Sequence, residues 1–427
     1  MFRTLGNAWK VADIRKKILY TLLMLLIYRV GIVIPAPGVN VAYIAEQVNN
    51  FTALGFLNML SGGGLESMSI FALGISPYLN ASIIMNLLTV AIPALERMAK
   101  EEENGRKKIS AITRFVSIGL AIIQAVGILL GMGANAVQST DAFNYITIVL
   151  CLTAGTAFIM WLGECINKNG IGNGISLIIM IGIVARLPHA LLAEVNARFQ
   201  TSDGSAIMII LELVLLALVF MATIALVQAV RKVPVQYAKR IIGNKQYGGV
   251  RQYIPLKMNA ANVMPIIFAQ ALMFIPMLFT KIAPGFAGAF ADMTGFWYNF
   301  TLAVLVIAFT YFYTAITVNP NMMAEDMKRN GGFIPGVKPG KKTVEYLDTI
   351  MTRITLPGSI FLAIVAILPT FAMKLGINNQ FALFYGGTSL LILVGVVLDT
   401  LQQIESYLLL RHYDGLMKTG RIKGRVG

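Results

Sequence analysis

The fold is decided by residues 51–93, which read FTALGFLNMLSGGGLESMSIFALGISPYLNASIIMNLLTVAIP. The stretch is apolar almost throughout, yet it is not one membrane helix. Its first apolar piece, Ala53–Leu60, gives about 12 Å of helix, whereas a span must cross about 30 Å of hydrocarbon. Gly62, Gly63 and Gly64 then interrupt any helix, because glycine permits positive φ. An apolar run long enough to span begins only at Ile75.

Non-helical backbone at membrane depth is stable only when it is buried in protein or lines a water-filled cavity. The sequence therefore predicts that residues 53–73 dip into a cavity or pore enclosed by the chain. A loop on the outer membrane surface is the alternative that this stretch alone leaves open. Short helical pieces, glycines and small residues predict few apolar contacts, so the segment is expected to open at low free-energy cost.

The composition indicates a polytopic membrane protein. Hydrophobic residues make up 57% of the 427 residues and charged residues 13%, and the mean hydropathy is +0.72. The cysteines Cys151 and Cys165 fall in one predicted helix about 21 Å apart, too far for a disulfide. No metal site or cofactor is predicted.

The positive charges set the topology. Of 35 Lys and Arg residues, 30 fall in alternate segments, which predicts ten spans with both termini in the cytoplasm. The apolar runs are 18–34, 75–93, 113–132, 145–166, 175–192, 206–230, 261–282, 298–318, 354–373 and 384–408.

Two cytoplasmic loops, residues 231–260 and 319–353, are longer than topology requires. Long loops with Gly and Pro turns and basic tips are usually functional, so both are predicted to dock a large or anionic partner. The residues predicted to make this contact are Lys239, Arg240, Arg251, Lys338, Lys341 and Lys342.

The polar stretch Thr201–Ser205 divides the spans into two sets of five, in residues 1–200 and 201–427. Two five-span sets enter the membrane from opposite sides, which is the condition for an inverted repeat. The predicted fold class is an all-α polytopic membrane protein with ten transmembrane helices in two pseudo-symmetric halves. Together with the segment 53–73 that dips between them, these halves form one integrated membrane domain.

Ionisable residues in the spans are few. Arg29, Glu164 and Asp399 lie toward span ends, where snorkelling or local pairing is expected, and Glu212 could sit at the interface. Two histidines and no catalytic motif argue against an enzyme. A neutral pore fits better than a secondary transporter for a small amphipathic substrate, which stays the alternative. An intramembrane protease is a distant third.

Five motifs carry a family resemblance. They are SIFALGISPYLNASII from residue 69, WLGECINKNGIGNGISL from 161, PVQYAKR from 234, FIPGVKPGKKT from 333 and GGTSLLILVGVVLDT from 386. The chain resembles the SecY family, the central channel subunits of the bacterial protein translocase, essentially from end to end. The resemblance implies a passive channel in the cytoplasmic membrane for unfolded polypeptides. Its lateral gate, between the second, third, seventh and eighth spans, would release membrane helices into the lipid bilayer. The implied partners are the SecA ATPase, the translating ribosome, the subunits SecE and SecG, signal peptides and nascent chains.

The resemblance also implies site residues. Residues 53–73 would be the plug, with Phe56, Leu57, Met59, Leu60, Gly62, Gly63, Gly64 and Leu65 at its centre. The pore ring would comprise Ile75, Leu79, Ile175, Ile179, Ile267 and Ile392. The first two pairs have i,i+4 spacing, which puts each pair on one helix face. The sequence departs from the family pattern at Lys338, where the family commonly has Arg. The planar guanidinium fork of Arg is thereby replaced by the point charge of a Lys ammonium group.

Overall fold

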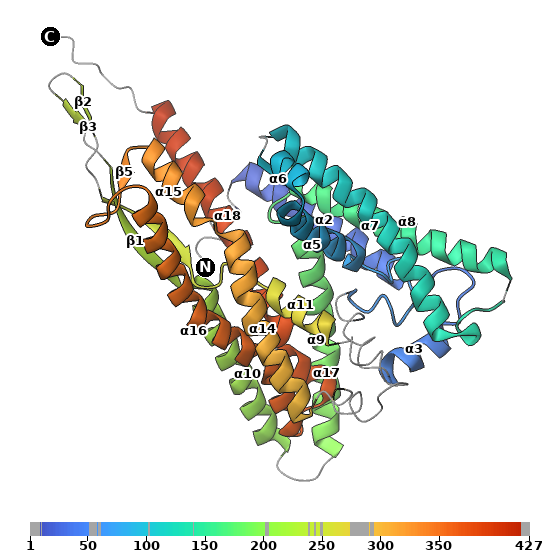
Figure 1. Cartoon of the computed structure of the whole chain (residues 1–427). Coiled ribbons are helices and arrows are strands. Elements are labelled where there is room, and N and C mark those ends of the chain that lie inside the picture. The colour runs from blue at the N-terminus through green and yellow to red at the C-terminus, as the bar shows by residue number, and fades with distance from the viewer. Residues whose placement is uncertain are drawn as a thin grey trace. The chain divides into compact units, whose positions relative to one another are not determined.

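The computed structural model describes residues 9, 11–50, 58, 61–100, 103–139, 141–200, 205–237, 240–242, 245–247, 251–273, 290 and 294–419. The chain divides into two compact units. The first comprises Met1–His189 with Val396–Gly427, and the second comprises Ala190–Gly395. Figure 1 labels their helices and strands.

The first unit is helical. Helix α7 packs against α5, α6 and α8, and α2 packs against α8. A shared apolar core includes Ile44, Leu65, Met68, Ala121 and Ile148, so the residues that follow the three glycines belong to the core of this unit. The elements are α2 (Ala12–Val33), α3 (Val41–Asn50), α5 (Ser76–Ala91), α6 (Pro93–Lys100), α7 (Glu103–Met132), η1 (Ala134–Ala136), α8 (Ala142–Asn169) and most of α9 (Gly174–Gln200).

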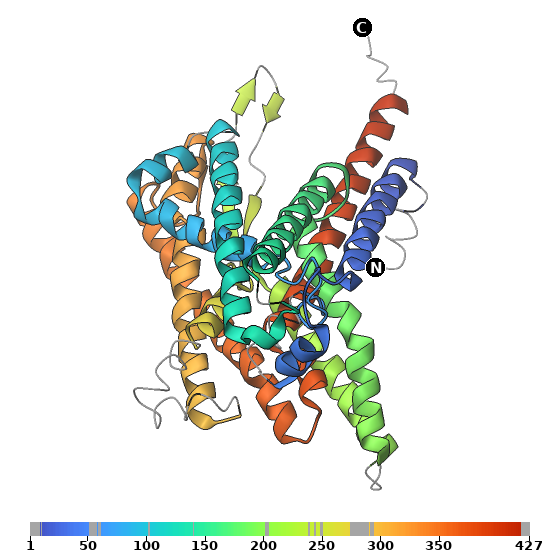
Figure 2. The same ribbon diagram turned by 90° about the vertical axis from the view of Figure 1, so that its right-hand side faces the viewer.

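The second unit is built around α16, against which α14, α15 and α10 pack. In the views of Figures 1 and 2, α14 runs alongside α16. The helical elements are α10 (Ser205–Gln228), α11 (Met264–Leu272), α14 (Phe296–Thr317), α15 (Pro320–Arg329), α16 (Lys341–Lys374), α17 (Asn379–Ala382), η2 (Leu383–Tyr385) and the start of α18 (Gly387–Thr419), whose later part belongs to the first unit.

Asparagine side chains fix the starts of two helices, α9 and α15. The Asn173 side-chain oxygen accepts hydrogen bonds from the backbone N–H groups of Ile175 and Ser176, at 3.2 and 3.3 Å, and thereby caps α9. Asn319 caps α15 in the same way, and Pro320 follows at the first helical position, where its missing N–H costs nothing. The glycine-interrupted stretch before residue 175 is therefore a capped turn between two helices.

The loop at 231–260 forms a β-ribbon. Strand β1 (Val230–Tyr237) pairs antiparallel with β4 (Arg251–Lys257), with Val233 opposite Ile254, and β5 (Gly332–Phe333) pairs with the other side of β1. Strands β2 (Arg240–Ile242) and β3 (Lys245–Tyr247) form a hairpin at the far end of the ribbon (Figures 1 and 2). The all-α fold class is right for the spans, and this sheet is an addition to it.

Val233 and Val235 explain the sheet, because alternate residues of a half-buried strand face the core. Both side chains are buried, and they pack with Leu256, Ile334 and Leu347. The ribbon, β5 and the first turns of α16 therefore share one small core outside the predicted membrane region.

Each of the ten predicted runs overlaps one helix: α2, α5, α7, α8, α9, α10, α11, α14, α16 and α18. Within the described residues, seven helices are long and apolar enough to cross a membrane. The runs that fall short are α2, which carries several charges, α5, which has 16 residues, and α11, which has nine residues. The structure is therefore that of a polytopic helical membrane protein.

Candidate functional site

The re-entrant segment, residues 61–75, lies in the first unit and runs as successive turns. Gly62, Gly63 and Gly74 have φ of 68°, 97° and 56°, which confirms the predicted need for positive φ. The predicted interruption of the helix at these glycines is confirmed, and the short piece that follows them, residues 65–73, forms turns instead of a helix. The predicted plug residues Phe56, Leu57, Met59 and Leu60 lie outside the described residues.

The second part of this segment is joined to the chain that follows α2. Ile70 N–H donates to the Ile34 carbonyl at 3.0 Å, and Ala36 N–H donates to the Met68 carbonyl at 2.9 Å. These bonds flank an antiparallel bridge between Pro35 and Ser69. The segment thus adds a short strand pairing to the end of the first span.

Glycines on the surrounding helices let the segment approach closely. A Cβ on Gly155 of α8 would overlap the Ile70 carbonyl oxygen, and a Cβ on Gly31 of α2 would overlap the Phe71 ring. A Cβ on Gly62 would lie 2.8 Å from the Gly182 Cα of α9. Three helices therefore present bare backbone to the segment.

Two arginines bind the first part of the segment. Arg29 Nη1 donates to the Gly62 carbonyl at 3.2 Å, so this span charge is paired locally. Arg186 Nη2 lies 2.6 Å from Glu66 Oε2, with side chains 27% and 38% exposed. Asn58 bonds Glu66 twice, at 3.1 Å to the carboxylate and 3.0 Å from the backbone N–H.

The expectation of few apolar contacts is wrong for residues 61–75. Leu65 and Met68 are 1% and 0% exposed, and Phe71, Leu73 and Ile75 are also buried. Burying a large apolar side chain contributes about 1.5–3 kcal/mol, so releasing all five would cost on the order of 10 kcal/mol. Loose packing was inferred from the small residues of this segment. In the fold, small residues instead allow two stretches of backbone to approach each other closely.

The predicted pore-ring residues divide between the units. Ile75 immediately precedes α5, and its carbonyl accepts from Leu79 N–H at 3.0 Å, so this pair spans the first turn. Ile175 lies at the start of α9 against Gly163 of α8, and Ile179 is buried one turn later. These four lie in the first unit, whereas Ile267 on α11 and Ile392 on α18 lie in the second. The ring remains a prediction.

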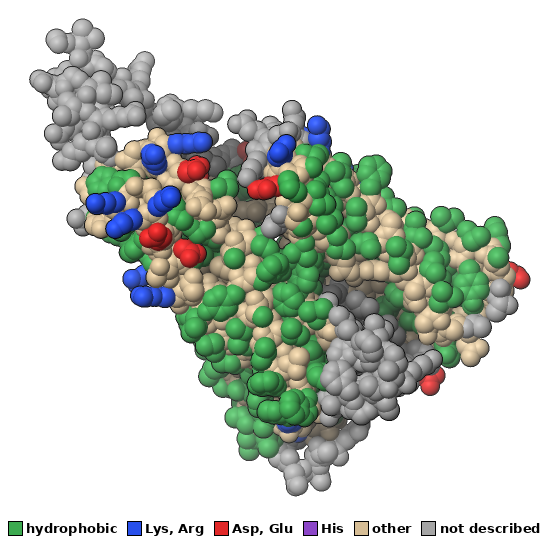
Figure 3. Space-filling view, viewed as in Figure 1, with side chains coloured by type: hydrophobic (Ala, Val, Ile, Leu, Met, Phe, Trp, Pro, Cys, Tyr) green, Lys and Arg blue, Asp and Glu red, His purple; other side chains and the backbone are tan. Residues whose placement is uncertain are grey.

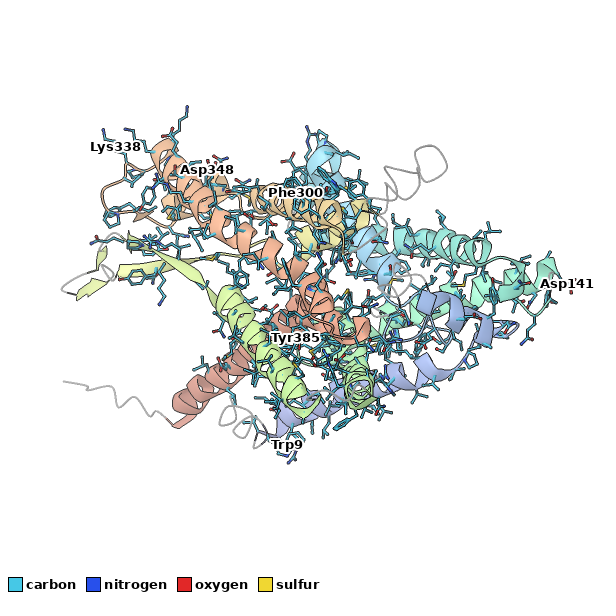
Figure 4. The ribbon with its side chains drawn as sticks, turned by 90° about the horizontal axis from the view of Figure 1, so that it is seen from below. Trp9, Asp141, Phe300, Lys338, Asp348 and Tyr385 are labelled. Carbon is cyan, nitrogen blue, oxygen red and sulfur yellow. The ribbon has the colours of Figure 1, made fainter. Side chains whose placement is uncertain are left out.

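The basic surface lies in the second unit. Lys338, Lys341 and Lys342 are exposed around the start of α16, and the Lys338 carbonyl accepts from the Thr343 hydroxyl at 3.0 Å. Figure 4 shows Lys338 beyond the start of α16 and Asp348 along that helix. Arg240 and Arg251 lie in β2 and β4, and Lys239 lies outside the described residues.

The two long loops differ in charge. Residues 231–260 hold seven basic and no acidic residues, whereas residues 319–353 hold six basic and four acidic residues. The space-filling view shows Lys and Arg interspersed with acidic side chains near β1, α15 and the start of α16 (Figure 3). A partner at the second loop therefore meets both signs of charge.

The sequence did not predict a buried ionic cluster in the second unit. Glu212 was expected near the interface, but it is buried and its Oε1 lies 2.5 Å from Arg198 Nη2. The same guanidinium binds Glu194 at 2.9 Å and donates to the Gly376 carbonyl at 3.0 Å. Asn378 N–H donates to Glu194 at 2.7 Å. The one signal in the sequence was the i,i+4 spacing of Glu194 and Arg198.

Tyr385 extends this cluster to η2. Its hydroxyl donates to the Glu212 backbone carbonyl at 2.8 Å. The cluster ties the α9 and α10 ends to the segment that follows α16.

Glu164 and Asp399, the other charged residues of the predicted spans, were expected to pair locally or to snorkel. Glu164 pairs with Arg114 at 2.8 Å, and both side chains are close to half exposed. Asp399 is exposed. Among the described residues, no group of three or more His, Cys, Asp or Glu side chains could hold a metal ion.

The fold and these features define a multi-pass helical membrane protein with a buried, broken re-entrant segment. The family model SecY matches residues 69–401. The protein translocase subunit SecY of Halalkalibacterium halodurans is 45% identical over 98% of this chain and 100% of its own length. The corresponding subunit of Mycobacterium bovis is 40% identical over 96% and 99%. The chain belongs to the SecY family, as its motifs indicated.

Solved structures agree in fold. A protein-conducting channel matches with a TM-score of 0.63 at 18% identity, over 92% of this chain and 93% of that one. Sec61 in the canine ribosome–channel complex from the endoplasmic reticulum matches with a TM-score of 0.60 at 17% identity, over 92% and 93%. At these identities the likeness establishes the architecture.

Proposed function

We propose that this chain is the channel subunit of a bacterial protein translocase. It passes unfolded secretory polypeptides across the cytoplasmic membrane, releases membrane helices sideways into lipid, and has both termini in the cytoplasm. The observation that carries this proposal is the buried, non-helical segment 61–75 within a unit of apolar helices, in a chain of the SecY family. Non-helical backbone at membrane depth is stable when it is buried in protein or lines a cavity or pore, and a channel provides both.

The span charges support a passive channel over a coupled transporter. Arg29 is bonded to the re-entrant segment, Glu164 to Arg114 and Glu212 to Arg198. These groups are engaged in structural contacts, whereas a proton-coupled carrier keeps ionisable groups along its substrate path. The family consists of channels, and the energy for transport would come from a motor outside the chain.

A stalled secretory chain tests this function. Photo-crosslinking residues would be placed at Ile75 and Ile179, with Phe143 as the control because its side chain is 80% exposed on α8. We expect crosslinks to the stalled chain from the first two positions and only background from Phe143. Equal yields from all three would contradict a central polypeptide path.

The six aliphatic residues are proposed to form the narrowest point of the channel, and residues 53–73 its plug. A short apolar constriction excludes ions by dewetting and yields to a moving chain, since no polar group holds either in place. The proposed halves, residues 1–200 and 201–427, would clamp around this point with a hinge near Thr201–Ser205.

Polar substitution should open this constriction. We expect Ile179→Asn, alone and with Ile175→Asn, to raise resting ion conductance of reconstituted vesicles several-fold and to relax the requirement for a strong signal sequence. The control is Ile123→Asn on α7, where the side chain is 68% exposed. If the double variant has the same conductance as the control, Ile175 and Ile179 are not part of the pore ring.

The long loops are proposed to dock the SecA ATPase and the translating ribosome, and the apolar helix faces to meet SecE and SecG. The exposed lysines at the start of α16 and the wholly basic loop at 231–260 support this proposal. Topology alone would be satisfied by positive charge anywhere near the span ends.

Charge reversal at the loop tips should slow transport and leave the pore intact. We expect Lys338→Glu and Arg240→Glu to weaken SecA or ribosome binding about threefold to tenfold at low salt and less at high salt, since exposed charges mainly steer encounter. Lys338→Arg should be neutral or slightly favourable. The measurements are binding at two salt concentrations and ATP-driven export, with Lys168→Glu as the matched control. Unaltered binding and export would mean that the positive charges of both loops only set the topology.

A further inference from the structure

The turn between α8 and α9, residues 170–173, is bonded by side chains from two other helices of the first unit. Ile171 N–H donates to the Thr21 hydroxyl oxygen of α2 at 3.1 Å. Gly172 N–H donates to Gln403 Oε1 of α18 at 2.9 Å. Backbone N–H groups outside a helix need partners from elsewhere, and here α2 and α18 supply them. The turn is therefore held by helices other than the two that it joins.

Apolar packing joins the same three parts of the chain. Ile171 is 3% exposed and shares a small apolar core with Ile14 of α2 and Ile404 of α18. The two helices also contact each other, because the Lys17 ammonium group lies 4.3 Å from the centre of the Tyr407 ring. Ile171 is thus the side chain that fixes the turn between α2 and α18.

Glycines bring the turn close to both helices. A Cβ on Gly170 would lie 2.5 Å from Thr21 Oγ1, and a Cβ on Gly172 would lie 3.1 Å from Thr400 Oγ1 of α18. Gly172 also has a φ of 87°, which a residue with a side chain rarely adopts. The contacts to α2 and α18 therefore depend on the glycines of this stretch.

The Thr21 hydroxyl is buried and uses both of its hydrogen-bonding roles. It donates to the Lys17 carbonyl of its own helix at 2.9 Å and accepts from Ile171 N–H. Thr21 is 7% exposed, so water does not readily replace it. Loss of the hydroxyl would leave the Ile171 N–H without a partner, which is costly for a buried group.

The turn sets the start of α9. This helix begins at Gly174, so Ile175 is its second residue and Ile179 lies one turn later. A Cβ on Gly163 of α8 would lie 3.0 Å from Ile175 Cγ1, which leaves Ile175 little room on that side. A helix turns by about 100° per residue, so a small displacement of its start would turn both isoleucines toward other neighbours.

We propose that Thr21 and Gln403 are positioning residues for the pore ring. By bonding the turn they fix the start of α9, and with it the direction in which Ile175 and Ile179 face. This inference rests on the proposed ring. It gives a role to the stretch NGIGNGIS, residues 169–176, whose glycines and N–H groups meet α2 and α18.

Thr21→Val tests the buried contact, because valine keeps the branched shape of threonine and lacks the hydroxyl. We expect resting ion conductance of reconstituted vesicles to rise several-fold and the Ile171 amide to exchange about tenfold faster or more. Thr21→Ser should restore both. The matched control is Thr113→Val on α7, since Thr113 is 6% exposed and its hydroxyl also donates to a carbonyl of its own helix, at 2.9 Å. That variant should keep the original values.

Gln403→Ala tests the second contact at an exposed position, where the substitution disturbs no buried side chain. We expect faster exchange at the Gly172 amide and a conductance rise smaller than that of Thr21→Val, because water can take over an exposed bond. Gln402→Ala, at the neighbouring exposed position, is the control and should leave exchange and conductance unchanged.

Photo-crosslinking supplies a readout that a merely structural role would not move. A photo-reactive residue at position 179 should crosslink to the same residues of a stalled secretory chain in the controls and to different ones in Thr21→Val. Faster exchange at Ile171 with unchanged conductance and crosslinks would overturn the positioning role, and so would equal conductance rises in Thr21→Val and Thr113→Val. If Ile179→Asn itself leaves conductance unchanged, the ring is overturned and this role with it, whereas the exchange rates would still show whether the turn is held.

Discussion

Arg198→Met should destabilise the second unit by about 3–5 kcal/mol, because removing one partner of a buried ion pair leaves uncompensated charge. Arg198 is the shared partner of Glu194 and Glu212, whose side chains are 2% and 8% exposed. Methionine keeps much of the side-chain length, so the loss reports charge more than volume. The measurement is thermal unfolding in detergent, where we expect the midpoint to fall by roughly 6–20 °C.

Arg114→Met is the matched control for this experiment. Arg114 also pairs with a glutamate in a span, but its side chain and that of Glu164 are 49% and 41% exposed. An exposed pair contributes about 0–1 kcal/mol, so this variant should unfold close to the original midpoint. Equal shifts for the two variants would contradict the conclusion that burial makes the Arg198 cluster structurally decisive.

The sequence located the apolar helices well because hydropathy reports them directly, and each predicted run overlaps a helix. The β-ribbon was missed because each long strand carries only one short alternation, Val233 with Val235 and Ile254 with Leu256, between turn-forming and basic residues. The buried state of Glu212 was missed because its partner Arg198 lies on another helix, and helix pairing leaves no mark in a hydropathy profile.

The site was predictable in outline and not in its energetics. Positive φ at Gly62 and Gly63 follows from residue type, and so does the interruption of the helix. The tight packing of residues 67–75 depends on Gly31 and Gly155, which lie far from them in the sequence and look there like ordinary glycines of membrane helices. A position where a glycine meets another segment's backbone is visible only in the folded chain.

Gly155→Ala therefore provides the second large effect. The added methyl group would overlap the Ile70 carbonyl, which is backbone and cannot swing aside, and overpacking a tight core costs about 1–3 kcal/mol. This cost opposes the gain of about 1 kcal/mol that alanine brings to a helix. We expect residues 67–75 to shift, the bond from Ile70 N–H to the Ile34 carbonyl to weaken, and resting ion conductance to rise several-fold.

Gly127→Ala on α7 separates this effect from helix propensity, since nothing lies within 4 Å of a Cβ built there. That variant should be neutral or about 0.5–1 kcal/mol more stable, with unchanged conductance. Amide hydrogen exchange supplies the local measurement, because the Ile70 amide should exchange faster in Gly155→Ala and at the original rate in Gly127→Ala. If Gly155→Ala keeps the original exchange rate and conductance, α8 can move away from residues 67–75 without loss, and Gly155 does not position them.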